Sequence, residues 1–152
     1  TLHSLLVADE VCVLPPGHAL ATRSVLTPAD FAGQPYVSLA ATDPYRQQVD
    51  AVFAAAGVAR QLRVETASAV SVCALVRQGL GLSIVNPLTA RELAASGLVV
   101  RPFTVSIPFH VALVQPALRA EHPLLPALRA ALQAAATELK AAAPQAGTRR
   151  RK

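Results

Sequence analysis

Short apolar runs alternate with segments of helical period along most of the chain. Buried strands are predicted at residues 11–14, 36–39 and 82–85, and further strands at 61–66, 99–103 and 109–114. Between them, Val49, Val52, Phe53 and Ala56 recur with the i, i+3, i+4, i+7 spacing of a helix face. Val72, Cys73 and Val76 form a second such stripe. Strands that alternate with helices predict an α/β fold with a largely parallel sheet.

The helix boundaries are marked by capping residues, prolines and glycines. Thr27-Pro28 and Asp43-Pro44 each combine an N-cap residue with a proline at the first helical position. Ser68 is the expected cap of the helix with the Cys73 stripe. We expect Pro87 to end a strand and a short helix to occupy residues 89–95. The longest helix is predicted from Pro123, with one apolar stripe of Leu124, Leu125, Leu128, Leu132, Ala135 and Leu139.

The net charge does not indicate a nucleic-acid groove. The chain has 152 residues and a formal net charge of +5, but residues 149–152 carry four of those positive charges. The rest of the chain is close to neutral, so it has no evident basic face for phosphates. We expect residues 141–152 to form a disordered basic tail. There is no apolar stretch of membrane-spanning length, and the first ten residues lack the basic region and cleavage site expected of a signal peptide. Because an initiator Met is missing, we expect the chain to open inside a longer reading frame or after a processing cut.

Catalytic and metal-binding patterns are weak. Cys73 with His110 or His122 is a conceivable nucleophile and base, but Cys73 sits between apolar neighbours on a helix stripe, where a buried thiol is expected. The acidic residues are scattered singly, and the four His residues lack zinc-type spacing. Gly79 and Gly81 follow a helix and precede a strand, the reverse of a phosphate loop. We therefore expect no enzyme, no cofactor and no metal.

The polar groups with the clearest binding potential lie where strands end and helices begin. Ser38 closes a strand ahead of the helix start at Asp43, and Thr66, Ser68 and Ser71 follow the next strand. Ligands collect at the carboxyl ends of parallel strands, and helix N-termini favour anions there. Arg46 could hold a carboxylate. The alternative is that Asp43 and Ser68 act only as helix caps.

Several segments resemble the effector-binding region of LysR-type transcriptional regulators. The stretches are VCVLPPGHALA, LTPADFAGQPYVSL, VETASAVSVCALVRQGLGLSIVNP and VALVQPALRAEHPLLPALRAAL, which together cover about residues 2–140. Ala19 stands where the family usually has Pro. The segment SLAATDPYRQQVDAVFAAAGV is also similar to the opine-responsive branch, which includes octopine and nopaline regulators.

This resemblance implies a type II periplasmic-binding-protein-like fold in which two lobes enclose a small-molecule site. Residues 1–14 would be a first-lobe remnant with a hinge strand, and 15–109 the complete second lobe. Residues 110–140 would be the return hinge strand and the last helix of the first lobe. The ligand-binding positions carried over are Ser38, Leu39, Ala40, Arg46, Thr66, Ser68 and His110.

The function implied is that of a cytoplasmic sensing domain for a small-molecule effector, of carboxylate or amino-acid-like chemistry. DNA would be bound only through an N-terminal winged helix-turn-helix absent from this chain, in a homodimer or homotetramer that does not involve a membrane. Two alternatives stay open: a periplasmic-type solute-binding protein of the same fold, and a small enzyme that uses Cys73.

Overall fold

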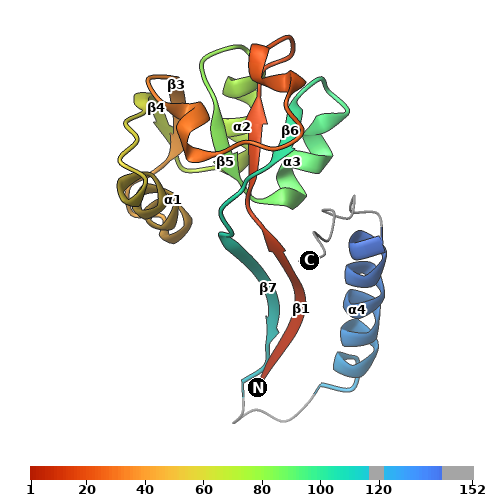
Figure 1. Ribbon diagram of the computed structural model, residues 1–152. Helices are drawn as coiled ribbons and strands as arrows, with labels where there is room; N and C mark the ends of the chain where they lie inside the picture. The colour runs from red at the N-terminus through yellow and green to blue at the C-terminus, as the bar shows by residue number, and fades with distance from the viewer. Residues whose placement is uncertain (117–121, 142–152) are drawn as a thin grey trace, which may run out of the picture. The chain divides into compact units, whose positions relative to one another are not determined.

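A computed structural model describes residues 1–116 and 122–141, and the chain divides into two compact units. The second unit spans Asp9–Pro108, and the first unit comprises Thr1–Ala8 and the described residues from Phe109 onward. The second unit contains strands β2 (Val11–Leu14), β3 (Pro35–Leu39), β4 (Gln61–Thr66), β5 (Ser83–Val85) and β6 (Val99–Pro102). Its helices are α1 (Pro44–Ala55), α2 (Ala69–Arg77) and α3 (Pro87–Ala94), with 3-10 turns at Ala19–Thr22 and Pro28–Phe31 (Figure 1).

The strands of the second unit line up in the order β4-β3-β5-β2-β6. Strands β3 and β4 pair in parallel, and a parallel bridge from Tyr36 to Leu82 joins β3 to the segment that opens β5. Strand β2 pairs antiparallel with both β5 and β6. The sheet is therefore largely parallel, as the alternation predicted, with β2 running against the others. Val11–Leu14, which was expected as a hinge crossing, forms an inner strand of this sheet.

Both faces of this sheet are buried, because successive side chains of a strand point to opposite sides. Cys12, Tyr36 and Ile84 pack on one face with Val49 and Phe53 of α1. On the other face lie their strand neighbours Val13, Val37 and Val85, which pack with Val72, Cys73 and Val76 of α2 and Ala90 of α3. This two-sided burial explains why the strands read as continuous apolar runs. Below, the side that α1 covers is called the α1 face.

The predicted helix starts are present, with differences in how they are capped. The Asp30 carboxylate accepts hydrogen bonds from the Thr27 backbone N–H at 2.8 Å and from its hydroxyl at 2.9 Å. Strand β5 ends at Val85, ahead of Pro87 as predicted, whereas the helix predicted at residues 89–95 starts two residues earlier. Helix α3 begins at Pro87, and the Asn86 side chain caps it by accepting from the Thr89 N–H at 2.9 Å. Proline suits the first helical position because the N–H group that it lacks would have no hydrogen-bond partner within the helix.

Gly81 lies where two segments of backbone approach closely. A Cβ built on Gly81 would be 2.5 Å from the Pro35 carbonyl oxygen and 2.9 Å from the Tyr36 nitrogen. Leu82 donates from its N–H to the same Pro35 carbonyl at 2.8 Å. The turn expected at this glycine therefore also brings β5 against β3.

The first unit contains a strand pair and one long helix. Strand β1 (Leu2–Asp9) pairs with β7 (Pro108–Val114), and α4 covers Leu125–Ala141 (Figure 1). Strand β1 was not predicted. Helix α4 leaves much of its expected apolar stripe exposed: Leu124, just before it, is 68% exposed and Leu128 is 51% exposed. Apart from Ala141, the tail expected at residues 141–152 lies outside the described residues.

We predict that amide hydrogens of the second unit exchange more slowly than those of α4. The second unit buries side chains on both faces of its sheet, whereas α4 exposes Leu124, Leu128 and Leu139. Few buried apolar contacts lower the free energy of local opening. Hydrogen–deuterium exchange of the whole chain, resolved by peptide, is the measurement. Equal protection of residues 15–109 and 122–140 would contradict the prediction.

Candidate functional site

The carboxyl ends of β3 and β4 lie side by side. Leu39 pairs with Thr66, and Ser38 pairs with Glu65. Ser38 is only 1% exposed, and among the described residues its hydroxyl oxygen has no hydrogen-bond partner. It lines a small cavity of about 10 Å³ with Leu39, Tyr45 and Arg46, which is about the room that one water molecule needs. Ala40 directly follows Leu39.

Two helices begin at this edge, and only one is capped by its side chain. Asp43 Oδ1 accepts from the N–H groups of Tyr45 at 2.8 Å and Arg46 at 3.2 Å. Ser68 occupies the N-cap position of α2 by its backbone, but its side chain makes no capping hydrogen bond. The Ser68 hydroxyl therefore does not cap α2, contrary to the interpretation of Ser68 as only a helix cap. That exposed hydroxyl lies two residues beyond Thr66, at the N-terminus of α2.

Arg46 ties the start of α1 to the ends of both strands. Its Nη1 donates to the Leu39 carbonyl oxygen at 2.7 Å and to Glu65 Oε1 at 2.9 Å. Its Nε donates to Asp50 Oδ2 at 2.7 Å. Burial works to lower the pKa of Arg46, but the hydrogen bonds to Asp50 and Glu65 outweigh burial and raise it. Arg46 is thus a fixed cation that positions the backbone after β3.

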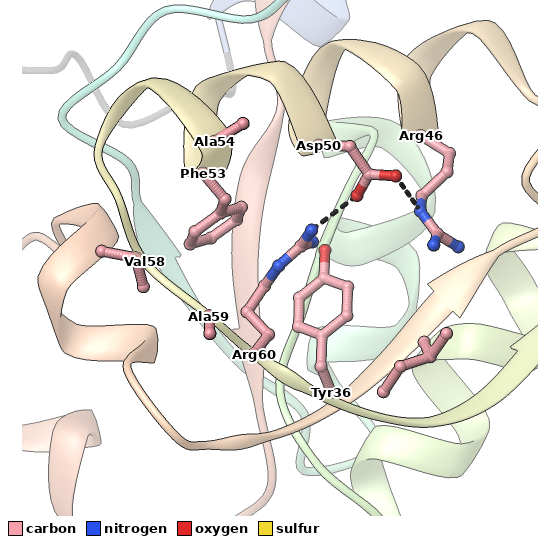
Figure 2. A pocket seen from close by; sticks show the side chains of 9 residues that line it. Tyr36, Arg46, Asp50, Phe53, Ala54, Val58, Ala59 and Arg60 are labelled. Atoms are coloured by element: carbon pink, nitrogen blue, oxygen red, sulfur yellow. Dashed lines mark hydrogen bonds and ion pairs between the residues drawn. The ribbon is translucent and has the colours of Figure 1, made fainter.

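The same ion network continues into a pocket of about 230 Å³ between α1 and β4 (Figure 2). Arg60 lines this pocket, and its Nη2 donates to Asp50 Oδ1 at 2.5 Å. The Arg60 guanidinium carbon lies 4.1 Å from the Phe53 ring centre and 4.5 Å from that of Tyr36. Asp50 thereby bridges two arginines, whose hydrogen bonds and charges overcome the effect of burial and lower its pKa. Arg60 is stabilised both by a carboxylate and by aromatic faces.

Glu10 is the functional candidate that the sequence pattern did not reveal. It lies immediately before β2, and its backbone N–H donates to the Ile107 carbonyl oxygen at 2.9 Å. It is only 3% exposed. Burial, and secondarily the charge of Asp43, raise the pKa of Glu10 to about 8. The signal available was an acidic residue directly ahead of a buried run, which on its own is also typical of a solvated strand start.

We predict that Glu10 makes the protein less stable as the pH rises. In the unfolded chain its pKa is near the ordinary 4.5, and in the folded chain it is about 8. The folded state holds the extra proton between these two values, so the free energy of unfolding falls with pH across this window. The Glu10→Gln variant should lack this pH-dependent fall in unfolding free energy. Above pH 8 it should be more stable than the unsubstituted protein by roughly 2–4 kcal/mol. Urea unfolding at several pH values measures this difference, and parallel curves for the two proteins would contradict the prediction.

Six of the seven expected binding positions belong to the second unit, and the structure gathers them at one edge. These are Ser38, Leu39, Ala40, Arg46, Thr66 and Ser68, at the ends of β3 and β4 and the starts of α1 and α2. His110 is an exposed residue of β7 in the first unit. Asp43 and Glu10 join this region from neighbouring positions in the second unit.

Cys73 is buried on the sheet side of α2. Burial raises the pKa of its thiol to about 11, which is the opposite of what an activated nucleophile requires. Among the described residues, no group of three or more His, Cys, Asp or Glu side chains could hold a metal ion. Of the helices in the described ranges, none combines the length and hydropathy that a membrane crossing requires.

Comparison with known proteins identifies relatives of this chain. Residues 2–137 match the model of the LysR substrate binding domain. The chain is 55% identical over 135 residues to the transcriptional activator protein LysR of Escherichia coli K12, covering 89% of this chain and 43% of that protein. It is 35% identical over 122 residues to the regulatory protein NocR of Agrobacterium tumefaciens T37, covering 80% of this chain and 41% of that protein. The chain thus spans less than half the length of these curated relatives.

A solved structure agrees on the fold. The regulatory domain of CcmR from Synechocystis PCC6803, determined in complex with 2-PG, superposes with a TM-score of 0.74 at 16% identity, covering 91% of this chain and 68% of that one. The architecture is that of the type II periplasmic-binding-protein-like fold of LysR effector domains. On the strength of the family match and of two longer regulatory relatives, this chain belongs to the LysR family of transcriptional regulators and carries its substrate-binding domain.

Proposed function

We propose that the chain is the part of a LysR-type regulator that senses a small-molecule effector of carboxylate or amino-acid-like chemistry. The observation that carries this proposal is the buried Ser38 hydroxyl, which has no hydrogen-bond partner among the described residues and lines a cavity where β3 ends. A buried hydroxyl without a partner costs free energy unless water or a ligand satisfies it. Thr66 and Ser68 supply further polar groups at the same edge of the sheet.

Arg46 supports the carboxylate part of the proposal. It holds a positive charge beside the ends of β3 and β4, and the N-terminus of α1 adds the positive end of the helix dipole. In this proposal an effector carboxylate shares the Arg46 guanidinium with Asp50 and Glu65. The overall 35% identity to NocR supports the finer resemblance to opine-responsive regulators.

The two compact units correspond in this proposal to the two lobes of the effector domain. The boundaries proposed from the structure are Asp9 and Pro108, so that β2 belongs to the second lobe and β1, β7 and α4 to the first. His110 then belongs to the first lobe. In the full regulator, effector binding biases an equilibrium between conformations of a cytoplasmic homodimer or homotetramer, and DNA is bound through a winged helix-turn-helix outside this chain.

Ligand-induced stabilisation of the whole chain tests the sensing function. A panel of small carboxylates and amino acids is added, and the melting temperature and hydrodynamic size are measured. A ligand that binds only the native state raises the melting temperature with its concentration. Ser38→Ala should weaken that shift, whereas Ser96→Ala, at the far end of α3, should leave it unchanged. If no member of the panel changes melting temperature or size, the sensing function is not supported.

A further inference from the structure

The pocket between α1 and β4 is not part of the proposed effector site and has the features of a second ligand site. It has a volume of about 230 Å³, and Arg46, Asp50 and Phe53 line it from one face of α1 (Figure 2). Arg60 and Leu62 line it from the start of β4. Pockets for drug-sized ligands measure about 300–1,000 Å³, so this pocket suits a smaller molecule.

The Arg60 end of the pocket lies far from the edge of the sheet where the proposed effector site is. Arg60 directly precedes β4, whose first residue Gln61 pairs with Pro35, the first residue of β3. Thr66, at the effector edge, is the last residue of β4, about 20 Å farther along the strand. Arg60 is therefore at the amino edge of these strands, whereas the effector site is at their carboxyl edge.

The Arg60 guanidinium has an unused hydrogen-bond donor. Its Nη2 donates to Asp50 Oδ1, and its carbon atom lies 4.1 Å from the Phe53 ring centre, so the group is held in place. Its Nη1 is buried and has no hydrogen-bond partner among the residues that the structure describes. A buried donor on a charged group costs free energy when it lacks an acceptor. An acceptor in the pocket would remove this cost.

Positive charges outnumber negative charges around this pocket. Asp50 pairs with both Arg46 and Arg60, and Glu65 pairs with Arg46. Arg63 of β4 donates to a side-chain amide oxygen and has no acidic partner within the described ranges. Three arginines of α1 and of the β4 segment are thus accompanied by two acids, and this surplus favours an anion as the missing acceptor.

The remaining wall of the pocket is apolar. It consists of Phe53 and Ala54 from α1, Val58 and Ala59 from the turn that follows, and Leu62 from β4. Leu62 is 47% exposed, although it lies on the side of β4 that lines the pocket. A compact apolar group placed there would cover Leu62 and remove apolar surface from water, which is favourable.

We propose that this pocket binds a small carboxylate with a compact apolar body, at a site separate from the proposed effector site. The carboxylate accepts a hydrogen bond from Arg60 Nη1, and the apolar body packs on Leu62 and the neighbouring alanines. This inference does not depend on the proposed sensing function. The two sites share one hydrogen-bond network, because Asp50 joins Arg60 to Arg46, which in turn holds the Leu39 carbonyl.

NMR titration of the isotope-labelled whole chain with benzoate, benzamide and acetate tests the proposal. Benzoate offers both the charge and the apolar body, benzamide keeps the body without the charge, and acetate keeps the charge without the body. We expect benzoate to shift the backbone amide signals of residues 53–62. It should bind roughly 5- to 50-fold more tightly than either of the other probes.

Two variants alter the pocket, and each has a matched control. Arg60→Met removes the donor but keeps the length of the side chain, and it should weaken benzoate binding by roughly 10-fold or more. Ala54→Leu keeps every charge and fills part of the pocket, so it should also weaken binding, and it decides the question if the Arg60 variant folds poorly. Arg63→Gln and Ala55→Leu make comparable changes at residues that do not line the pocket and should bind benzoate as the unsubstituted protein does.

The outcomes distinguish this pocket from the effector site. Ser38→Ala should leave benzoate binding unchanged. Binding that is lost in Ser38→Ala but kept in Arg60→Met would place benzoate at the effector edge and overturn the inference, while small-molecule sensing stands. Equal affinity for benzoate and benzamide would overturn the carboxylate as the ligand group. If none of the three probes shifts the signals of residues 53–62, the pocket is not a ligand site, whatever the effector panel shows.

Discussion

Replacement of Gly81 by alanine is expected to destabilise the second unit by about 3–5 kcal/mol. The added Cβ would lie 2.5 Å from the Pro35 carbonyl oxygen and 2.7 Å from its carbonyl carbon. Both are backbone atoms held between β3 and β5, so neither can move aside without disturbing the sheet. Gly81 also has a backbone φ of +157°. Urea unfolding followed by circular dichroism measures the loss.

Gly79 provides a matched control two residues away. Its φ of +87° is unfavourable for alanine, but a Cβ there would meet no atom within 4 Å. Gly79→Ala should therefore show the conformational cost alone, about 1–2 kcal/mol. Equal losses for the two variants would show that the contact with Pro35 is not the cause.

Replacement of Phe53 by alanine is expected to cost about 3–5 kcal/mol of unfolding free energy. Phe53 is fully buried, and its ring centre lies 5.2 Å from that of Phe31 and 6.0 Å from that of Phe103. It also carries the Arg60 guanidinium on its face at 4.1 Å. The variant thus leaves a cavity and removes part of the environment that stabilises a half-buried cation. Thermal and urea unfolding measure the loss.

The cation contribution can be separated from the cavity by a double-mutant cycle. Phe53→Leu keeps most of the apolar volume, and Arg60→Met keeps the length of the side chain without its charge. We expect the two substitutions to be coupled by about 1 kcal/mol. Additive effects within a few tenths of a kcal/mol would mean that Arg60 gains nothing from the aromatic face, and that its ion pair with Asp50 alone holds it in place.

The polar edge of the sheet illustrates what local sequence reasoning can find. Hydroxyl residues that follow two predicted strands meet there because β3 and β4 pair in parallel, with Leu39 opposite Thr66. Parallel pairing follows from the helix between the two strands, so this part of the site was accessible from the pattern. The i, i+4 spacing of Arg46 and Asp50 was likewise readable, although the partners Leu39 and Glu65 were not.

Arg60 and Glu10 were not found from the sequence, for a common reason. The environment of each residue depends on elements distant in the chain or on a turn without periodicity. Arg60 follows the glycine-terminated end of α1 and folds back over Phe53 and Tyr36. Glu10 is buried, and its pKa is raised by this burial and by the charge of Asp43, which lies on the far side of β3 in the sequence. Such desolvation arises only when the elements pack.

The sequence by itself determined the order of strands and helices in the second unit, the largely parallel sheet, most helix starts and the polar residues where strands end. These features follow from periodicity, capping residues and the short range of backbone hydrogen bonding. Tertiary structure alone decided that β2 runs against its neighbours, that Gly81 meets the Pro35 backbone, and that Glu10 is buried. Each of these depends on contacts between segments far apart in the chain. A local sequence pattern does not show the energies of such contacts.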